Sequence, residues 1–325
     1  MKQRLYYLDL AKVLAAFLVV LGHLYSQNSD VRLYLAAFHV PVFFLISGIF
    51  HKNIGRVQIA KYSKTLLWPT AFFIAFMLIF KPIAAILVGD NPFKIEVNLL
   101  KATGKVFVDG RIGVYWFLVA LFWCKVFTDL FLTGTRKITF VLLCILGLFI
   151  PLFVNSYFHF RYRILLPFLV CQALMAMPFY LLGFYAKKYF MHLTPKWKYG
   201  VMGLLCLVLN IGLTQINGRV SMVHLNFGEL QFPFSIIVFY LNGLIGSAMI
   251  ICISLIPIPK LAIIHRLGEA LLAIVGFQAL FNYLYRAVIG WDQNIVVSSL
   301  SSIIIMLLCY FLHIFLSRYY MPKKA

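Results

Sequence analysis

The sequence predicts an all-α membrane protein, a bundle of about ten transmembrane helices with both termini in the cytoplasm. Hydrophobic residues make up 63% of the 325 residues and charged residues only 12%, whereas soluble domains average about 45–50% apolar and about 25% charged residues. Mean hydropathy is +0.94, and apolar stretches near the ~20 residues that a bilayer requires recur along the chain. The sequence contains no linker, repeat or soluble segment, so residues 1–325 are expected to form one membrane domain.

Ten spans follow from these stretches, each bounded by polar or Gly/Pro-containing breaks such as SQNSDVR, GDNPFK, TGTRK and GWDQN. Their expected limits are 5–25, 33–50, 64–88, 113–133, 138–156, 165–187, 199–216, 232–256, 262–286 and 294–316. The first span has a basic start like a signal peptide, with Lys2 and Arg4. Asp9 and Lys12 interrupt its apolar run, and no small-residue cleavage site follows, so it is expected to be a retained helix.

The distribution of positive charge orients the bundle. With an inner N-terminus, 17 of the 29 Lys and Arg residues fall in inner segments and 10 in outer ones, and inner segments are the ones enriched in positive charge. The net charge of +20 is therefore mainly an orientation and lipid signal rather than a nucleic-acid surface. The six cysteines all lie within expected spans and form no C-x-x-C pair, so neither disulfides nor a metal site is expected.

Three ionisable residues lie on one stripe of the first span. Lys12 and His23 are eleven residues apart, almost three helical turns or roughly 16 Å, and Asp9 lies one turn before Lys12. Ionisable groups are costly at membrane depth and usually serve a function there. The alternative is structural: Asp9 and Lys12 neutralise each other near the start of the helix, and His23 reaches the opposite interface.

The second span ends in FHVPVFFLISGIF, with His39, Pro41 and the pair Ser47-Gly48. Proline removes a backbone hydrogen bond that neighbours must replace, and Gly48 permits close helix packing. His39 and His23 both belong to the outer half of consecutive antiparallel helices, so they are expected to approach each other across a shared site. For a lone histidine, a hydrogen-bonded core position would be the alternative.

YLDLAKVLAAFLVVLGH followed by FHVPVFFLISGIF resembles the opening of the acyltransferase-3 family of integral membrane acyltransferases, most of all its fucose 4-O-acetylase-like branch. The family pattern is an Asp, an Arg three residues later and a His eleven residues after that Arg; Asp9, Lys12 and His23 stand at these positions. The resemblance continues through VYWFLVALF, MAMPFYLLGFY, NGRVSMVHLNFG and HRLGEALLAIVGFQ. It therefore covers most of the chain.

The chain departs from the family pattern at four positions. Lys12 replaces the family arginine and loses the planar fork that grips carboxylates or phosphates. In the late motif that begins at Gly268, Leu271 stands near a usual Ser and Gln278 at a usual His. Gln278 can bond a ligand but cannot carry a proton. Ser221 stands where an acidic residue is common.

The resemblance implies O-acyl transfer from acetyl-CoA to a sugar hydroxyl of a bacterial cell-surface polysaccharide or its lipid-linked precursor. The protein would then be a multi-pass enzyme of the bacterial inner membrane that contacts lipid and the glycan, and polysaccharide-assembly proteins are further candidate partners. A sugar hydroxyl needs a base, for which His23 is the candidate; an acetyl-His23 intermediate is a variant. Lys12 would stabilise negative charge or hold the CoA end of the donor, and Asp9 would orient it.

Further residues are candidate binding groups. The basic inner segment HKNIGRVQIAKYSK would bind CoA phosphates through Lys52, Arg56, Lys61 and Lys64, although anionic lipid is an equal explanation. Expected outer contacts with the glycan are His39, Trp116, Arg111, Arg161, Arg163, Arg219, Glu229 and Gln278. Trp116 fits an interfacial aromatic belt equally well. Glu269 is expected to be buried and to pair with His265 or Arg266.

Two other functions fit parts of the sequence. A transporter or flippase for a lipid-linked sugar would also have many spans and charges near the midplane, although no inverted repeat or paired broken helices are visible. A non-catalytic component of a glycan-assembly complex would agree with Gln278 and with the change at Lys12.

Overall fold

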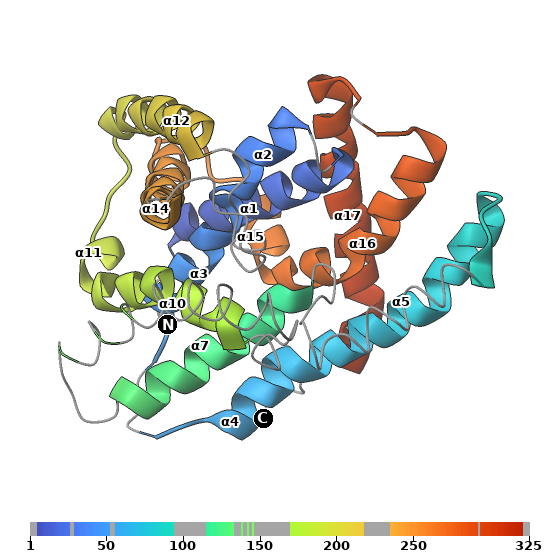
Figure 1. Cartoon of the computed structure of the whole chain (residues 1–325), viewed down its shortest axis with the longest axis horizontal. Helices are drawn as coiled ribbons and strands as arrows, with labels where there is room; N and C mark the ends of the chain where they lie inside the picture. The colour runs from blue at the N-terminus through green and yellow to red at the C-terminus, as the bar shows by residue number, and fades with distance from the viewer. Residues whose placement is uncertain are drawn as a thin grey trace.

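The computed structural model describes residues 5–26, 29–52, 56–93, 115–132, 138, 142, 145, 170–217, 235–291 and 293–320. These segments are helices and the turns between them (Figure 1). In chain order the helices are α1 (Tyr6–Leu24), α2 (Asp30–Ala36), α3 (His39–Ile49), α4 (Ile59–Tyr62), a π-helical turn (Ser63–Leu67), α5 (Trp68–Leu87), α7 (Trp116–Leu132), α10 (Val170–Tyr185), α11 (Lys187–Met191), α12 (Lys198–Asn217), α14 (Ser235–Ser254), α15 (Ala262–Glu269), α16 (Leu271–Val288) and α17 (Ile295–Tyr320).

The all-helical architecture is confirmed for the described residues. Seven helical segments there are long and apolar enough to cross a bilayer: 6–24, 30–49, 59–87, 198–217, 235–254, 271–288 and 295–319. Helices α7 and α10 coincide with two more expected spans but have only 17 and 16 residues. The expected span at 138–156 lies largely outside the described residues. The total of ten crossings therefore stays a prediction.

Two expected spans are interrupted. The segment 33–50 consists of α2 and α3 with a turn at Ala37 and Phe38. Pro41 lies in the first turn of α3, where its missing N–H removes no intrahelical bond. The segment 262–286 breaks at Ala270, between α15 and α16. The first break places His39 at the start of α3, whereas the second is followed by the apolar start of α16.

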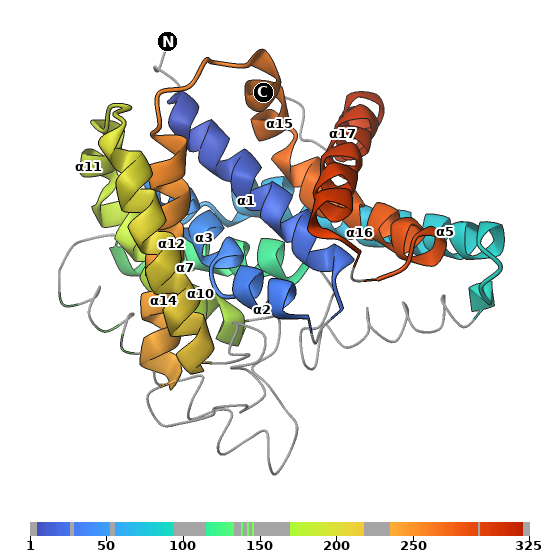
Figure 2. The ribbon, with the colours of Figure 1, turned by 90° about the horizontal axis from the view of Figure 1, so that it is seen from above.

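Contacts between distant residues define two ends of the bundle. At the first end, Trp68 Nε1 donates to the Tyr319 carbonyl (3.4 Å), and the Tyr7 hydroxyl donates to the Phe190 carbonyl. At the second end, the Tyr25 hydroxyl donates to the Gln293 carbonyl (3.0 Å). The start of α1 and the end of α17 therefore lie at the first end (Figure 2), as an inner position of both termini requires.

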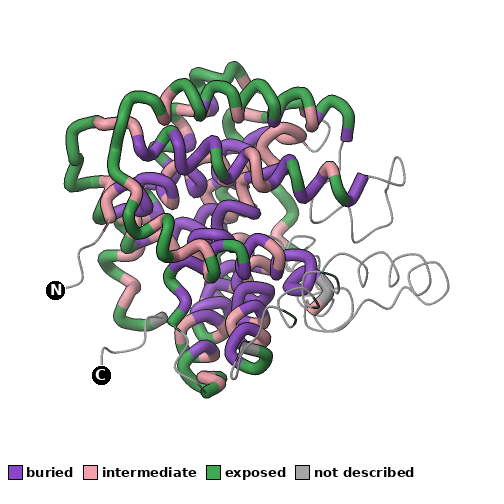
Figure 3. The backbone as a smooth tube through the Cα atoms, turned by 90° about the vertical axis from the view of Figure 1, so that its left-hand side faces the viewer, coloured by how far each residue is buried: buried purple, intermediate pink, exposed green. Residues whose placement is uncertain are grey.

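Helix α1 is the central element of the bundle. In its most apolar window 72% of the residues are buried, against 17% for α12, 28% for α17 and 33% for α5. The outer helices expose leucine, isoleucine and valine, for example Leu204, Leu205 and Val208 on α12. Figure 3 shows the same division, with buried backbone inside and exposed backbone at the periphery. An apolar exterior of this kind suits lipid, and a polar residue on α1 is thereby held inside protein.

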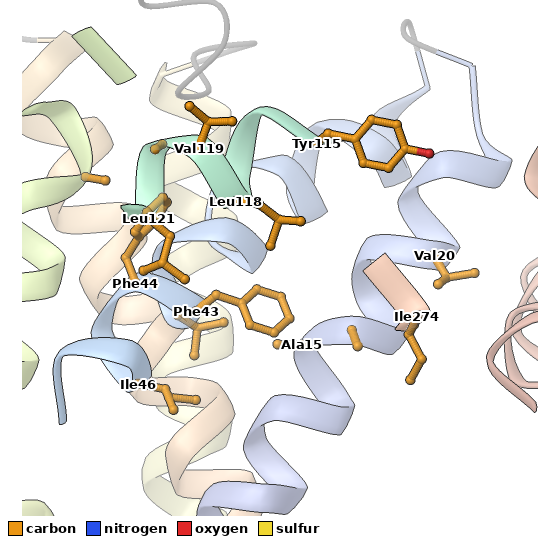
Figure 4. Packing of buried hydrophobic residues seen from close by; sticks show 14 of the residues in the cluster. Ala15, Val20, Phe43, Phe44, Ile46, Tyr115, Leu118, Val119, Leu121 and Ile274 are labelled. Carbon is orange, nitrogen blue, oxygen red and sulfur yellow. The ribbon is translucent and has the colours of Figure 1, made fainter. Parts of the chain in front are cut away.

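Small residues let the helices around α1 approach closely. A Cβ at Gly48 of α3 would lie 1.9 Å from the Tyr180 carbonyl oxygen of α10, and one at Gly183 would lie 2.0 Å from the Leu45 carbonyl oxygen. Only a residue without a side chain fits at each place. Next to this contact, Phe43 and Phe44 pack against α7, and Ile274 of α16 joins the same core as Ala15 and Val20 of α1 (Figure 4).

Candidate functional site

Asp9 is the centre of a polar cluster at the first end of α1. Its carboxylate is buried, with 2% of the residue exposed, and it accepts from Lys12 Nζ (3.3 Å) and contacts His265 Nδ1 (3.4 Å). Gly268 lies beside it, because a Cβ there would approach the Asp9 carboxyl group to 3.5 Å. Asp9 therefore connects α1 to the start of the α15–α16 pair.

Lys12 faces the segment that follows α3. Its ammonium group lies 4.3 Å from the centre of the Phe50 ring, in addition to its bond to Asp9. The side chain keeps 18% of its surface exposed. An ammonium group held between a carboxylate and an aromatic ring is fixed in position, and it borders the basic inner segment of residues 51–64.

Glu269 is not buried, and the expectation that it would be is wrong. Its side chain is 56% exposed, and Oε1 lies 3.7 Å from His265 Nε2. The pairing with His265 is confirmed, because the two residues stand one turn apart on α15. Helix α15 is amphipathic and turns the side that carries His265 and Glu269 outward. The five residues HRLGE are too short a stretch to reveal this orientation.

His23 occupies the other end of α1. The residue is partly exposed, and its ring makes no hydrogen bond to another described residue. Its backbone carbonyl accepts from Arg286 Nη1 of α16 (3.2 Å). The arrangement fixes the backbone of this turn and leaves both ring nitrogens for a ligand, as a base that must receive a proton requires.

His39 lies near His23 and has one nitrogen engaged. Its Nδ1 bonds the Leu35 carbonyl, and a carbonyl only accepts, so Nδ1 carries the hydrogen and Nε2 of the neutral ring is an acceptor. The two rings are within electrostatic range of each other, together with Arg32 and Arg286. His39 therefore belongs to the surroundings of His23, and a shared site for the two rings stays a prediction.

Arg286 is the site residue that the sequence reading missed. It was counted among the outer charges, yet it extends from the last turn of α16 to His23 and lies 4.4 Å over the Trp291 ring. The sequence did contain a signal for including Arg286 in the site. Arg286 follows Gln278, a suspected ligand residue, by eight residues, which is about two turns of the same helix.

The four basic residues expected to bind CoA lie on the inner segment. Lys52, Arg56, Lys61 and Lys64 are all exposed, and Lys61 Nζ donates to Gln58 Oε1 (3.1 Å). They surround the start of the helical run that leads into α5. The structure thus presents them to solvent or lipid headgroups, and it favours neither CoA nor lipid as their ligand.

A second buried network fixes this segment. Asp129 of α7 accepts from His51 Nε2 (3.0 Å), the Tyr62 hydroxyl (2.9 Å) and the Gln58 amide (3.2 Å). Burial lowers the pKa of His51 to about 4, so the ring is neutral at pH 7, and its Nδ1 accepts from the Tyr180 hydroxyl (2.8 Å). With His51 only 2% exposed, the network anchors the segment rather than contacting a substrate.

The remaining expected contacts are distributed differently. Trp116 begins α7 and packs partly buried against the core. Gln278 is 1% exposed, and its Oε1 has no hydrogen-bond partner among the described residues. The positions of Arg111, Arg161, Arg163, Arg219 and Glu229 lie outside the described residues. Within the described part of the chain, no group of three or more His, Cys, Asp or Glu residues is arranged to hold a metal ion.

Comparison with known proteins gives one match. A family model described as an acyltransferase domain matches residues 5–317, nearly the whole chain. No curated protein and no solved structure matches. The matched region includes both ends of α1, the basic inner segment and all of α16.

Proposed function

The chain belongs to the acyltransferase-3 family, and on that premise we propose that it transfers an acetyl group from acetyl-CoA to a sugar hydroxyl of a bacterial cell-surface polysaccharide or its lipid-linked precursor. Family membership favours acyl transfer over transport or a purely structural role. The fucose 4-O-acetylase-like branch and the inner membrane of a bacterium remain part of this proposal. The observation that carries the catalytic assignment is the partly exposed ring of His23 on the central helix, which bonds no other residue that the structure describes.

The donor is proposed to bind at the first end. CoA phosphates need positive charge, which Lys52, Arg56, Lys61 and Lys64 supply on an exposed segment. Lys12 is held by Asp9 and by the ring of Phe50, which directly precedes this segment in the chain. Eleven residues of helix separate it from His23, roughly 16 Å, so Lys12 serves the CoA end of the donor and not the reacting carbonyl.

Transfer is proposed to occur at His23. A ring nitrogen takes the proton of the sugar hydroxyl while the sugar oxygen bonds to the acetyl carbonyl carbon. The carbon–sulfur bond then breaks, and the departing CoA sulfur receives the proton from the imidazolium. The carbonyl oxygen gains negative charge on the way, and Arg286 is the cation beside His23 that can stabilise it.

The test is the acetylation of the surface polysaccharide in the producing organism. O-acetyl groups are measured by NMR in the wild type, in a gene deletion, and in the deletion complemented with His23→Ala or His192→Ala, with membrane expression verified. His192 is a matched control, because it is exposed and bonds only the nearby Lys188 carbonyl in the described structure. We expect O-acetyl groups to be lost in the deletion and with His23→Ala and kept with His192→Ala.

Unchanged acetylation in the deletion would contradict the proposed function as a whole. Loss in the deletion with full acetylation by His23→Ala would leave the transferase in place and remove His23 as its base.

A further inference from the structure

Helix α16 carries three buried polar side chains whose polar atoms have no partner among the described residues. They are Gln278 Oε1, Asn282 Oδ1 and the Tyr285 hydroxyl. The exposed fractions of these residues are 1%, 2% and 8%. An unpaired buried polar group destabilises the fold, so three on one helix are a substantial loss of stability unless something binds them.

The three side chains lie on one stripe. Positions 278, 282 and 285 are separated by four and three residues, which places them on the same face of a helix. Gly276 and Phe277 face α5, since a Cβ at Gly276 would lie 2.4 Å from the Phe73 ring and Phe277 packs on the same ring. The stripe is therefore on the side of α16 away from α5.

That side of α16 borders α1. Ile274, one turn before Gln278, belongs to the same core as Ala15 and Val20 of α1 (Figure 4). The two helices run in the same direction, with Gly268 beside Asp9 at the first end and Arg286 bonded to the His23 carbonyl at the second. Arg286, which bonds the His23 carbonyl, follows Asn282 by four residues and Tyr285 by one on the same helix, so the end of the stripe lies within about one turn of the level of His23.

The unpaired atoms indicate the chemistry of their ligand. Amide oxygens only accept hydrogen bonds, so Gln278 and Asn282 need a ligand that donates. Carboxylate and phosphodiester anions only accept hydrogen bonds and cannot satisfy these two oxygens. A sugar carries several O–H donors, and the hydroxyl of Tyr285 can donate to or accept from another sugar oxygen.

We propose that Gln278, Asn282 and Tyr285 form the acceptor subsite, where they bind the hydroxyl groups that flank the reacting one and hold the sugar against His23. This inference rests on the proposed function and extends it to a subsite of defined chemistry. Asn282 and Tyr285 are new assignments. Gln278 stands where the family pattern has a histidine, and the proposal gives this difference a binding role. The amide oxygen accepts a hydrogen bond from a sugar O–H, and no proton transfer is required of this residue.

The experiment uses near-isosteric replacements that remove the unpaired atoms: Gln278→Met, Asn282→Leu and Tyr285→Phe. Each full-length variant is purified in lipid nanodiscs for thermal unfolding and for titration with acetyl-CoA, and polysaccharide O-acetylation is measured in complemented cells. Asn242→Leu is the matched control. Asn242 is also 2% exposed, but its amide bonds Asn210 (2.5 Å) and Thr214 (2.8 Å).

A binding subsite predicts a combination of stability, donor affinity and activity in the three variants that a purely structural role does not predict. The three α16 variants should keep or raise Tm, keep their affinity for acetyl-CoA, and lose O-acetylation by about tenfold each. Asn242→Leu should lower Tm while its folded fraction keeps its activity, because it breaks satisfied bonds between α12 and α14, and neither helix carries a proposed site residue.

Three results would overturn the inference. A fall in Tm like that of Asn242→Leu would show that the stripe has internal partners. Unchanged O-acetylation would show that no substrate depends on it. Weaker acetyl-CoA binding would assign the stripe to the amide N–H groups of the donor's pantetheine arm. Failure of the proposed function would be recognised by a different result, namely unchanged acetylation in the gene deletion. That result does not depend on the three α16 variants.

Discussion

The chemistry of single residues differs sharply between the two ends of α1. His39, His51, His192 and His265 each bond another group through a ring nitrogen, whereas the His23 ring has no such partner among the described residues. At the other end, Asp9 and Lys12 are fixed to each other and to neighbouring elements. A fixed cation suits binding, and a ring with open nitrogens suits proton transfer.

Lys12 gives the prediction that separates binding from transfer. Lys12→Arg should keep more activity than Lys12→Ala, because both basic side chains supply the positive charge for CoA. Lys12→Ala should raise KM for acetyl-CoA by about tenfold and change kcat little, since Lys12 lies far from His23. Steady-state kinetics on the purified variants would check this, with the exposed Lys260→Ala as control.

The same kinetic and stability measurements also test the alternative that Lys12 has only a structural role. If all Lys12 variants transfer acetyl groups with wild-type KM, and only Tm falls in Lys12→Ala, then Lys12 merely neutralises Asp9. The buried Asp9 would in that case account for the loss of stability, about 1–3 kcal/mol for a group left unsatisfied.

At the scale of elements, close contacts between helices set where these residues lie. Helices α3 and α10 touch through their backbones at Gly48 and Gly183, and the Asp129 network attaches the segment after α3 to α7. Both contacts fix the basic segment that follows Phe50, the residue whose ring Lys12 contacts. The position of the proposed donor site would thus depend on residues that never meet the donor.

Gly48→Ala tests this dependence. The added Cβ would lie 1.9 Å from the Tyr180 carbonyl oxygen, and backbone on both sides cannot yield as a flexible side chain would. We expect at least about 3 kcal/mol of destabilisation, measured as a lower Tm and less folded protein in the membrane.

Gly212→Ala on α12 is the control for Gly48→Ala. A Cβ at Gly212 meets nothing within 4 Å, so this change should be neutral or stabilise by up to about 1 kcal/mol through helix propensity. Equal stability of the two variants would show that α3 and α10 are not in backbone contact.

Elements differ in how far the sequence alone predicts them. The long apolar runs indicate α1, α5, α12, α14 and α17 within a few residues, because apolar length and breaking residues are local properties. The turns at Ala37 and Ala270 lie inside continuous apolar patterns and depend on tertiary contacts. The same holds for Arg286: its charge reads as an outer-loop signal until the parallel course of α1 and α16 brings it to His23.

For the whole molecule, the bundle presents an apolar exterior around a polar central helix. Exposed aliphatic side chains cover α12, α17 and α5, while α1 has the largest buried share of the seven spanning segments identified in the described residues. Composition predicts this membrane class directly, because no soluble domain of this size is so apolar. Which helix is central follows only from packing, although the ionisable residues of α1 already pointed to it.

The orientation of the bundle can be measured with two exposed positions at opposite ends. The charge bias predicts that the first end faces the cytoplasm. Ile289 and Tyr319 are similarly exposed, at 47% and 52%, and lie at the second and first ends. We expect a membrane-impermeant maleimide to label Ile289→Cys in intact spheroplasts and Tyr319→Cys only after permeabilisation. The opposite pattern would reverse the orientation and place the proposed CoA site outside the cell.

The most direct measurement is acetyl transfer by the purified protein. Labelled acetyl-CoA is supplied to the wild type and to His23→Ala in nanodiscs, with polysaccharide from the gene-deletion strain as acceptor, after both proteins are shown to bind acetyl-CoA equally. We expect the wild type to move label onto the polysaccharide and His23→Ala to be at least about a hundredfold slower. Equal transfer by both proteins, or none by either, would contradict acyl transfer with His23 as the base.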